Sequence, residues 1–438
     1  MWTHSSISCL ELHYVLCSKL ASIMSGESVA CIDINGESVK YYASRVQGSG
    51  TCGLNIWRTQ IVKTSSFQLN SSRTDRAHTL SRFIAEAVRL CGKDCEQQQL
   101  RLRGAVLIET HDSSSLDARF VQAMGAYGVP VFTPCALKGS AQSLNDNFER
   151  SRHVLVPDFY FLQSGGYSAL RQKVRFSDTP WRRKNAKVVW RGSSTGPIIT
   201  GTSDAELARN SRLALALAAK NPSNSGLDAA IALPIIQLPP HVAEAVEARG
   251  LIGANMTQAE LMHARGIIDI DGNSNAWTGF FWKLFCKSVT LKVSSSYEQW
   301  FYKDLIPWTH YVPVAADLAD LHGRVDFVVN RMQNHSQDQQ LKQIGEASTA
   351  LIRSSGAFNH TAIGQRMLRF LGDAWPKLIW ENSSGYRRAG STPPGAGRAS
   401  VLRQVNTARE FGPWQTGSAE LRNYQAFTLT YLNRSVIL

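Results

Sequence analysis

Three short segments of this sequence carry side chains whose types and spacing suit chemistry. The first is His111-Asp112, which follows closely on the apolar run Ala105 to Ile108. A carboxylate just past a buried strand is placed to take a proton from a hydroxyl, so Asp112 is a candidate general base. The commoner role of such a residue is to cap a helix, here one expected near Ser115, and both interpretations stay open on the residues alone.

The second segment is the basic passage from Arg171 to Arg191, which holds eight Lys and Arg residues against one acid, Asp178. It ends in the small-residue loop Arg191 to Gly196. The backbone N–H groups of this loop are suited to a diphosphate, with its arginine as charge partner. Trp181 and Trp190 interleave the passage, which also fits a nucleic-acid groove. A solvated basic face, a phosphate site and a nucleic-acid surface are therefore open alternatives.

The third segment is Asp269-Ile-Asp271, formally the D-x-D pattern with which many sugar-nucleotide transferases hold a divalent ion. Its first two residues are expected in a strand, so that both carboxylates lie on one face. The small polar turn Gly272 to Asn275 follows and leads to the start of a helix. There the helix dipole and the free N–H groups of the first turn stabilise an anion without a metal.

Alternating helix and strand patterns must position these segments. Apolar residues recur at helical spacing from Thr79 to Cys91, and short apolar runs at Ala105 to Ile108 and Val129 to Thr133 indicate strands with a helix between them. This strand, helix, strand order is a βαβ unit, which implies a parallel sheet. Asp112 then lies near the carboxyl end of a strand, where open α/β sheets bind their ligands.

A second series of strands and helices begins near residue 180. Two S/T-x-x-E capping boxes start helices in it, one expected to run from Ser203 through Leu217 and the other from Thr257 until Gly266. A helix with an aromatic buried face is expected from Ala276 to Lys287, and helical patterns continue beyond Asp317. The expected strands are Lys187 to Trp190, Ile267 to Ile270 and Val289 to Val293.

The two series predict an α/β protein of two domains, with parallel sheets facing a central cleft. We expect an N-terminal domain over residues 1–180 and a C-terminal domain over residues 181–380. A Gly-, Pro- and Ser-rich linker with a basic tail is expected over residues 381–438.

Composition narrows the class of protein. The chain has 438 residues, is 43% hydrophobic and 18% charged, and carries a formal net charge of +13. These values exclude collagen, a coiled coil and wholesale disorder, while the charge indicates an anionic partner. No window of about 18 uninterrupted apolar residues exists, so no transmembrane helix is expected.

The cysteines leave two interpretations open. Seven of the eight lie within the first 135 residues, which fits disulfides in an oxidising compartment and buried thiols equally well. Cys91 and Cys95 have no second Cys or His pair at zinc spacing, so no metal site is expected there.

A long string after the D-x-D segment resembles a known family. W-F-Y at 300–302, P-W-T-H-Y-V-P-V at 307–314 and D-L-A-D-L at 317–321 resemble the signature of glycosyltransferase family 90, the capsule-associated-protein-like O-glucosyl- and xylosyltransferases. The resemblance begins at Asp269 in this region and extends upstream to W-R-R-K-N-A-K-V-V-W-R-G-S at 181–193.

The resemblance implies a GT-B fold of two Rossmann-like domains and metal-independent, inverting transfer from a UDP-sugar. Asp112 matches the family's catalytic base, and Arg191, Gly192 and Ser193 match its diphosphate loop. Two positions depart from the family: Ser194 and Thr278 stand where many members have arginines that contact phosphate. The residues expected to bind the donor are Arg191, Gly192, Ser193, Ser194, Asp271, Gly272, Asn273, Ser274, Asn275, Lys283 and Lys292.

We therefore predict a glycosyltransferase that moves glucose or xylose from UDP to a hydroxyl of a glycan or protein acceptor, with no metal and no other cofactor. Nucleic acid is not an expected partner. The alternatives are a nucleic-acid-binding module that uses the basic passage 171–191, and a catalytically inactive, glycan-binding relative for which the two missing arginines argue.

Overall fold

The computed structural model describes residues 129–330 and 335–374 continuously, together with four strands and single positions in the part of the chain before them. The expected linker and basic tail, the cysteine pair at 91 and 95, and His111 lie outside the described residues. The domain boundaries given above stay predictions.

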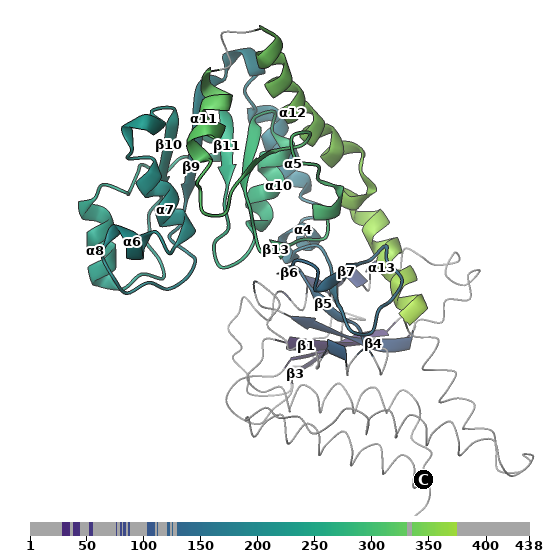
Figure 1. Cartoon of the computed structure of the whole chain (residues 1–438). Helices are drawn as coiled ribbons and strands as arrows, with labels where there is room; N and C mark the ends of the chain where they lie inside the picture. The colour runs from purple at the N-terminus through teal and green to yellow at the C-terminus, as the bar shows by residue number, and fades with distance from the viewer. Residues whose placement is uncertain are drawn as a thin grey trace, which may run out of the picture.

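The first sheet contains seven strands. They are β1 (Val29–Asn35), β2 (Ser38–Ala43), β3 (Cys52–Asn55), β4 (Arg103–Glu109), β5 (Val131–Thr133), β7 (Ala141–Ser143) and β8 (His153–Leu155). Their order across the sheet is β3-β2-β1-β4-β5-β8-β7 (Figure 1). β4 pairs antiparallel with β1 and parallel with β5, and the parallel pair confirms the predicted βαβ unit.

The second sheet contains five strands that all run parallel, in the order β10-β9-β11-β12-β14. They are β9 (Asn185–Gly192), β10 (Leu227–Ile231), β11 (Ala264–Asp269), β12 (Val289–Val293) and β14 (Val312–Val314). Every residue of β11 and β12 is buried, as expected for parallel strands covered by helices on both faces. This sheet confirms the second α/β half.

Helices connect and cover the strands. The helices that follow the first sheet and those within the second half are α4 (Phe159–Gln163), α5 (Ser168–Ser177), α6 (Asp204–Leu207), α7 (Ser211–Ala218), α8 (Pro240–Ala248), α9 (Gln258–Leu261), α10 (Trp277–Phe285) and α11 (Leu321–Val329). Short 3-10 turns lie at η1 (Trp181–Arg183), η2 (Pro222–Asn224), η3 (Tyr302–Asp304) and η5 (Gly356–Phe358). None of the described helices is long and apolar enough to span a bilayer.

Two long helices lead from the second half back to the first sheet (Figure 1). α12 (His335–Ser354) packs against α10, and α13 (His360–Ala374) reaches the first sheet, where Phe370 packs on Phe132 with ring centroids 6.4 Å apart. A small antiparallel pair, β6 (Ala136–Leu137) with β13 (Tyr297–Glu298), joins the halves a second time. The helical ending of the described chain is as predicted.

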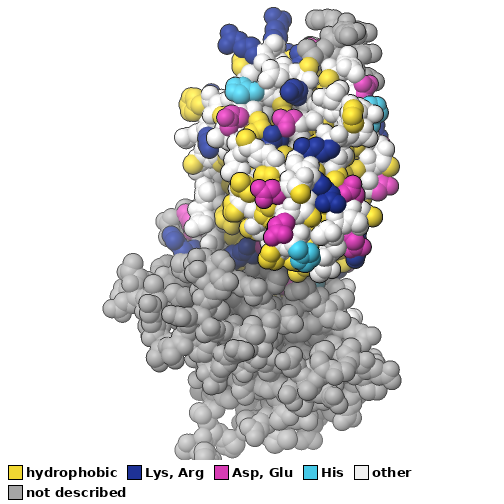
Figure 2. All heavy atoms as spheres, turned by 90° about the vertical axis from the view of Figure 1, so that its left-hand side faces the viewer, with side chains coloured by type: hydrophobic (Ala, Val, Ile, Leu, Met, Phe, Trp, Pro, Cys, Tyr) yellow, Lys and Arg dark blue, Asp and Glu magenta, His cyan; other side chains and the backbone are white. Residues whose placement is uncertain are grey.

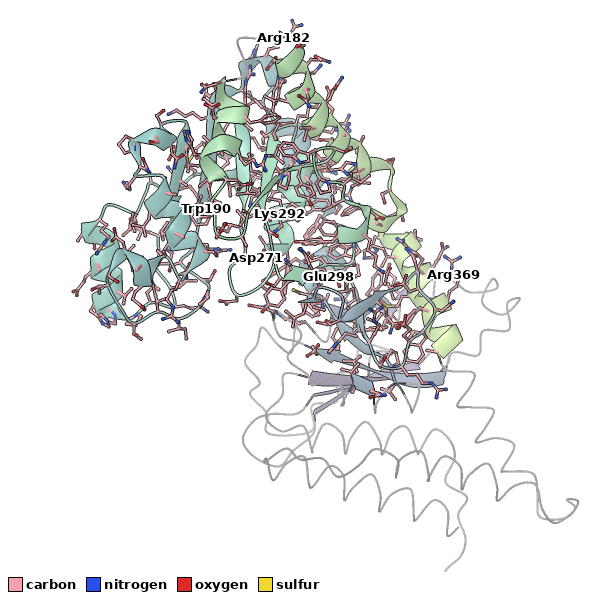
Figure 3. All side chains as sticks on the ribbon, viewed as in Figure 1. Arg182, Trp190, Asp271, Lys292, Glu298 and Arg369 are labelled. Atoms are coloured by element: carbon pink, nitrogen blue, oxygen red, sulfur yellow. The ribbon has the colours of Figure 1, made fainter. Side chains whose placement is uncertain are left out.

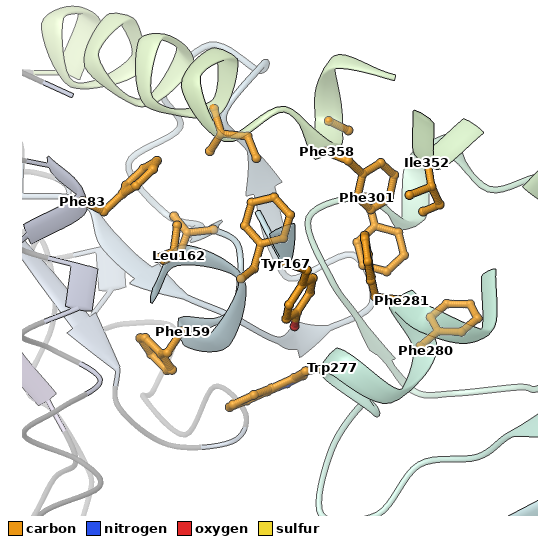
Figure 4. Packing of buried hydrophobic residues seen from close by; sticks show 14 of the residues in the cluster. Phe83, Phe159, Leu162, Tyr167, Trp277, Phe280, Phe281, Phe301, Ile352 and Phe358 are labelled. Atoms are coloured by element: carbon orange, nitrogen blue, oxygen red, sulfur yellow. The ribbon is translucent and has the colours of Figure 1, made fainter. Parts of the chain in front are cut away.

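Aromatic side chains from both halves share one core (Figure 4). Tyr167 packs on Phe281 with ring centroids 4.6 Å apart, and Phe159 meets Trp277 edge to face at 6.0 Å. Each such pair contributes about 0.5–1.5 kcal/mol beyond the burial of its area. The start of α10 is therefore fixed against α4 and α5 by packing.

Two predicted helices differ from those in the structure. The segment from Ser203 through Leu217 is two helices, because Asn210 accepts hydrogen bonds from the amides of Arg212 and Leu213 and starts α7 anew after α6. The capping box of Thr257 and Glu260 is present, but its helix ends at Leu261. Gly266 does not stop it, since that residue lies inside β11.

Gly266 lies where β9, β12 and the covering helix α11 approach closely. A Cβ there would lie 2.8 Å from Val188 Cγ2, 3.0 Å from Leu291 Cδ1 and 3.1 Å from Val328 Cγ1. We expect Gly266→Ala to lower the free energy of unfolding by about 1–3 kcal/mol through overpacking, measured by thermal and urea unfolding.

Gly323→Ala is the matched control, because nothing lies within 4 Å of a Cβ at that position of α11. It is expected to raise stability by about 0.4–1 kcal/mol through the unfolded state. Equal unfolding midpoints for the two variants would contradict the packing assigned to Gly266.

Candidate active site

A buried charge cluster lies where β11 ends. Asp269, the last residue of β11, is fully buried between two lysines, with Lys283 Nζ 2.8 Å from Oδ1 and Lys292 Nζ 2.8 Å from Oδ2. Burial opposes its charge, but the two ammonium groups lower the pKa of Asp269 below its usual value. Lys283 comes from α10 and Lys292 from β12, so the carboxylate fixes a helix to a strand.

Asp271 extends this cluster toward solvent. Its Oδ1 lies 3.1 Å from Lys292 Nζ, so one ammonium group bridges both carboxylates of the D-x-D segment. The two carboxylates therefore lie on one face, as the sequence predicts. Ser295 donates to Oδ2 of Asp271, and Asn275 donates to Oδ1 at 3.4 Å. The turn from Asp271 to Asn275 is thereby held at the start of α10 (Figure 3, where Asp271 and Lys292 are labelled).

Arg212, which the sequence reasoning missed, holds the loop after β9 against this turn. From the first turn of α7 its guanidinium donates to the Asp271 carbonyl at 2.9 Å, the Ser193 carbonyl at 3.1 Å and Thr195 Oγ1 at 2.7 Å. β9 and β11 are neighbours and run parallel, so their carboxyl ends meet at one edge. A cation between their two loops is the arrangement that binds a phosphate group.

Gly272 lets the two loops approach. A Cβ there would collide with Thr195 Oγ1 and would lie 2.8 Å from Arg212 Nη2. Within the same turn, the Gly272 amide donates to the Ser274 carbonyl at 3.0 Å, Ser274 is buried and Asn273 is exposed. The turn residues expected to bind the donor are therefore brought together with Ser193.

Arg191 and Ser194 lie elsewhere in the same region. The Arg191 guanidinium pairs with Asp228 at 2.8 Å and donates to the Ala254 carbonyl at 3.0 Å, so its charge is already compensated beside β10. The Ser194 hydroxyl donates to the Ile236 carbonyl and clamps a neighbouring loop. Their expected roles as donor ligands stay predictions.

Asp112 lies past the end of β4 and is paired with Arg76 at 2.9 Å. Its carboxylate is partly exposed, with 38% of the side chain accessible. The Arg76 guanidinium also lies over the ring of Trp277, 5.1 Å from its centroid. Because Trp277 opens α10, one arginine connects the candidate base to the helix that starts at the donor turn.

Cys135 also connects the two halves, beside the donor turn. Its thiol donates to Asn275 Oδ1 at 3.1 Å across the junction. Burial raises the pKa of Cys135 to about 12, and the negative charges of Asp271 and Asp112 add to the shift. Asp112 and Asp271 are therefore both within electrostatic reach of one thiol, although they belong to different sheets.

Thr278 occupies the position where the family resemblance implies an arginine. Its hydroxyl lies 3.0 Å from the hydroxyl of Tyr167, which in turn donates to Asp158 at 2.7 Å. Asp158 is fully buried and also accepts from the amides of Tyr160 and Phe161 at the start of α4. Thr278 thus belongs to a hydrogen-bond network that connects α10 to the starts of α4 and α5.

The D-x-D carboxylates do not form a metal centre in the part of the chain that the structure describes. Among the described residues, no group of three or more His, Cys, Asp and Glu side chains is placed to hold a metal ion. Both carboxylates of the segment are instead taken up by lysine ammonium groups. This donor set suits an anion bound nearby better than a divalent cation.

The fold and the site define an α/β protein of two main sheets. A loop held by Arg212 and the start of α10 lie at the carboxyl ends of the second sheet. Residues 149–360, just under half of the chain, match the model of Glycosyl transferase family 90. The family resemblance is thereby confirmed. The match includes the loop after β9, Arg212 and the whole D-x-D turn, and it leaves out Asp112.

Two viral relatives have no assigned activity. The chain is 30% identical over 154 residues to the uncharacterized protein 035R of Invertebrate iridescent virus 3, covering 34% of this chain and 13% of that protein. It is 26% identical over 231 residues to the uncharacterized protein 027R of Frog virus 3 (isolate Goorha), covering 47% and 22%. The chain thus spans less than a quarter of the length of these relatives.

A glycosyltransferase from Rickettsia africae ESF-5 aligns in space with 70% of this chain and 96% of its own. The identity is 12% and the TM-score 0.34, which is too low to establish a shared fold.

The buried Asp158 predicts a pH dependence of stability. Burial raises the pKa of Asp158 to about 6, although hydrogen bonds from Tyr167, Phe161 and Tyr160 oppose the shift. Between about pH 4 and pH 6 the unfolded chain ionises this carboxyl while the folded chain keeps it protonated, so this contribution to stability is lost as pH rises. Two pKa units correspond to about 3 kcal/mol.

We expect Asp158→Asn to remove this dependence, because the amide is neutral at every pH in the range. The difference in free energy of unfolding, variant minus wild type, should rise by up to about 3 kcal/mol between pH 4 and pH 7, measured by urea unfolding. A constant difference across that range would contradict a neutral Asp158 in the fold.

Proposed function

We propose that this chain is an inverting glycosyltransferase that moves glucose or xylose from a UDP-sugar to a hydroxyl of a glycan or protein acceptor without a metal ion. The observation that carries the proposal is the position of Arg212, whose guanidinium joins the loop after β9 to the D-x-D turn. Both loops lie at the carboxyl ends of neighbouring parallel strands, where α/β sheets bind nucleotides.

The charges at this edge favour a diphosphate. Arg212, Lys283 and Lys292 face only two carboxylates, those of Asp269 and Asp271, which leaves a surplus of one positive charge. α10 adds the partial positive charge of its N-terminus. Its N-cap, Ala276, supplies no side-chain hydrogen bond to the N–H groups of the first turn, so an anion can accept from them. A bound UDP group would receive this cation and the free N–H groups together.

Asp112 supplies the base in this mechanism. Its carboxylate takes the proton of the acceptor hydroxyl as that oxygen attacks C1 of the sugar from the face opposite UDP. The bond between C1 and the diphosphate oxygen breaks, and UDP leaves with the negative charge that Arg212 and the start of α10 stabilise. Arg76 orients the carboxylate through its 2.9 Å ion pair. An aspartate at this position supports an active enzyme over an inactive relative.

The lysine pairing supports transfer without a metal. A divalent ion on the D-x-D segment would have to displace Lys292 from both carboxylates and leave a buried ammonium group without its partners. Lys292 already places a positive charge at the position that such an ion would take. UDP binding is therefore expected to be unchanged by EDTA.

Asp112→Asn tests the base. We expect turnover of UDP-glucose or UDP-xylose to fall about 10²- to 10⁴-fold, with UDP affinity unchanged, because the amide cannot accept the proton. Release of UDP in the absence and presence of candidate acceptor glycans is the measurement. Asp146→Asn is the matched control, since it also removes a carboxylate from a 2.9 Å ion pair, with Lys303, at a similarly half-exposed site.

Full activity of Asp112→Asn would disprove the base assignment. If the wild-type chain binds UDP and turns over neither sugar nucleotide with any acceptor, the inactive, glycan-binding alternative is correct.

Arg212→Gln tests the diphosphate site. We expect UDP affinity to fall about 10- to 100-fold, because a charge-assisted hydrogen bond contributes about 1.5–3 kcal/mol, measured by calorimetric titration with and without EDTA. Arg209→Gln, three residues before Arg212 and with 68% of its side chain exposed, is the control and should bind UDP like the wild type. Equal UDP affinities of the two variants, both verified as folded by their melting curves, would contradict the site.

A further inference from the structure

The basic passage that precedes β9 lies at the opposite end of the second sheet from the candidate active site. The Asn185 amide donates to the His263 carbonyl at 2.6 Å, just before β11 begins. The Lys287 amide, just before β12, donates to Asp178 at 2.9 Å. These contacts place the passage at the amino ends of three parallel strands, whereas Ser193 and Asp271 follow the carboxyl ends.

The length of β9 sets the distance between the two ends. Its eight residues span about 26 Å at about 3.3 Å per residue. In Figure 3 Arg182 accordingly lies at the top of the view, well above Asp271. Charges that far apart are screened at physiological salt, where the Debye length is about 8 Å. The basic passage therefore does not serve the diphosphate, and its charge needs another explanation.

Six of the cations at this end are exposed and form no ion pair with any described residue. The single acid of the passage, Asp178, is occupied by Lys184 at 2.7 Å and by the Lys287 amide. Among the described residues, none of the exposed cations around it forms an ion pair. Figure 2 shows Lys and Arg side chains projecting at the upper edge of the second half. The exposed cations, here called the amino-end cluster, are Lys173, Arg175, Arg182, Arg183, Lys187 and Lys287.

One aromatic side chain accompanies the cluster. Phe176 lies in the last turn of α5, beside Arg175, and is 85% exposed. An exposed ring next to unpaired cations is typical of surfaces that insert into the headgroup region of a bilayer. Nothing in the packing of α5 requires a Phe at this position, since the buried residue of that helix is Val174.

The same surface suits nucleic acid less well. Binding of single strands depends on several aromatic rings on which successive bases stack, along a groove. The two tryptophans that interleave the passage are buried, Trp181 under Arg265 and Trp190 in the core of the second half. A single exposed ring remains, which is enough for insertion into a lipid surface and gives no stacking platform.

We propose that the amino-end cluster and Phe176 form a docking surface for a membrane that carries anionic phospholipids. The phosphate-bearing headgroups compensate the six cations, and the Phe176 ring enters the boundary with the acyl chains. Each Lys or Arg near such a surface strengthens binding about fivefold. Docked in this way, the chain directs the carboxyl ends of its second sheet, with the candidate active site, away from the bilayer.

Sedimentation of the full chain with lipid vesicles tests the proposal. We expect binding to vesicles of phosphatidylcholine with 30% phosphatidylglycerol, no binding to phosphatidylcholine alone, and loss of binding at high salt. Arg182→Glu/Arg183→Glu should weaken binding by at least about 25-fold, from about fivefold for each cation lost. Phe176→Ala should weaken it about tenfold and leave its salt dependence unchanged.

Arg209→Glu/Lys220→Glu is the matched control, because it changes the net charge equally at exposed positions outside the cluster. It should bind vesicles like the wild type, and melting curves verify that each variant is folded. Three results would overturn the proposal: unchanged vesicle binding of the cluster variant, equal losses in the cluster variant and the control, or tighter binding of a single-stranded oligonucleotide that depends on Arg182 and Arg183.

Discussion

The ammonium group of Lys292, shared between two carboxylates, is the interaction on which the proposed site depends. It lies 2.8 Å from Asp269 and 3.1 Å from Asp271, so it ties the last residue of β11 to the turn that follows. Burial opposes the charge on Lys292, but Asp269, Tyr302 and Asp271 raise its pKa well above the usual value. The group therefore stays charged, and the turn keeps one conformation across the physiological pH range.

This constraint reaches the rest of the site through neighbours. Lys283 attaches α10 to the same carboxylate, which fixes the helix that begins after the turn. Arg212 attaches the loop after β9 to the Asp271 carbonyl. Burial of Asp269, Lys283 and Lys292 costs free energy that only close pairing offsets, so removing one partner would leave a buried charge at a cost of about 3–5 kcal/mol. Such a cluster is better explained by what it positions than by stability alone.

The sequence predicts the strands and the turn well because their signals are local. The segment Val289–Val293, with an apolar residue at every second position, and the D-x-D pattern specify a strand and a polar turn without reference to the rest of the chain. Arg212 gives no such signal, since it stands in an otherwise apolar helix and only the fold brings it to Ser193 and Asp271. Its nearest sequence cue is the cap Asn210, which starts a helix directly after the small-residue loop.

Charge is where sequence order misleads most. The basic passage runs directly into Arg191 and the small-residue loop. From the sequence alone, its cations are therefore expected to lie near the diphosphate. A parallel strand lies between them, and eight extended residues carry the chain from one end of the sheet to the other. At the carboxyl end the cations are nearly balanced by Asp269 and Asp271, whereas the six exposed cations at the amino end form no ion pair with any described residue. Part of the net charge of +13 is therefore separate from the proposed chemistry, and its partner must be an anion that meets the opposite end of the sheet.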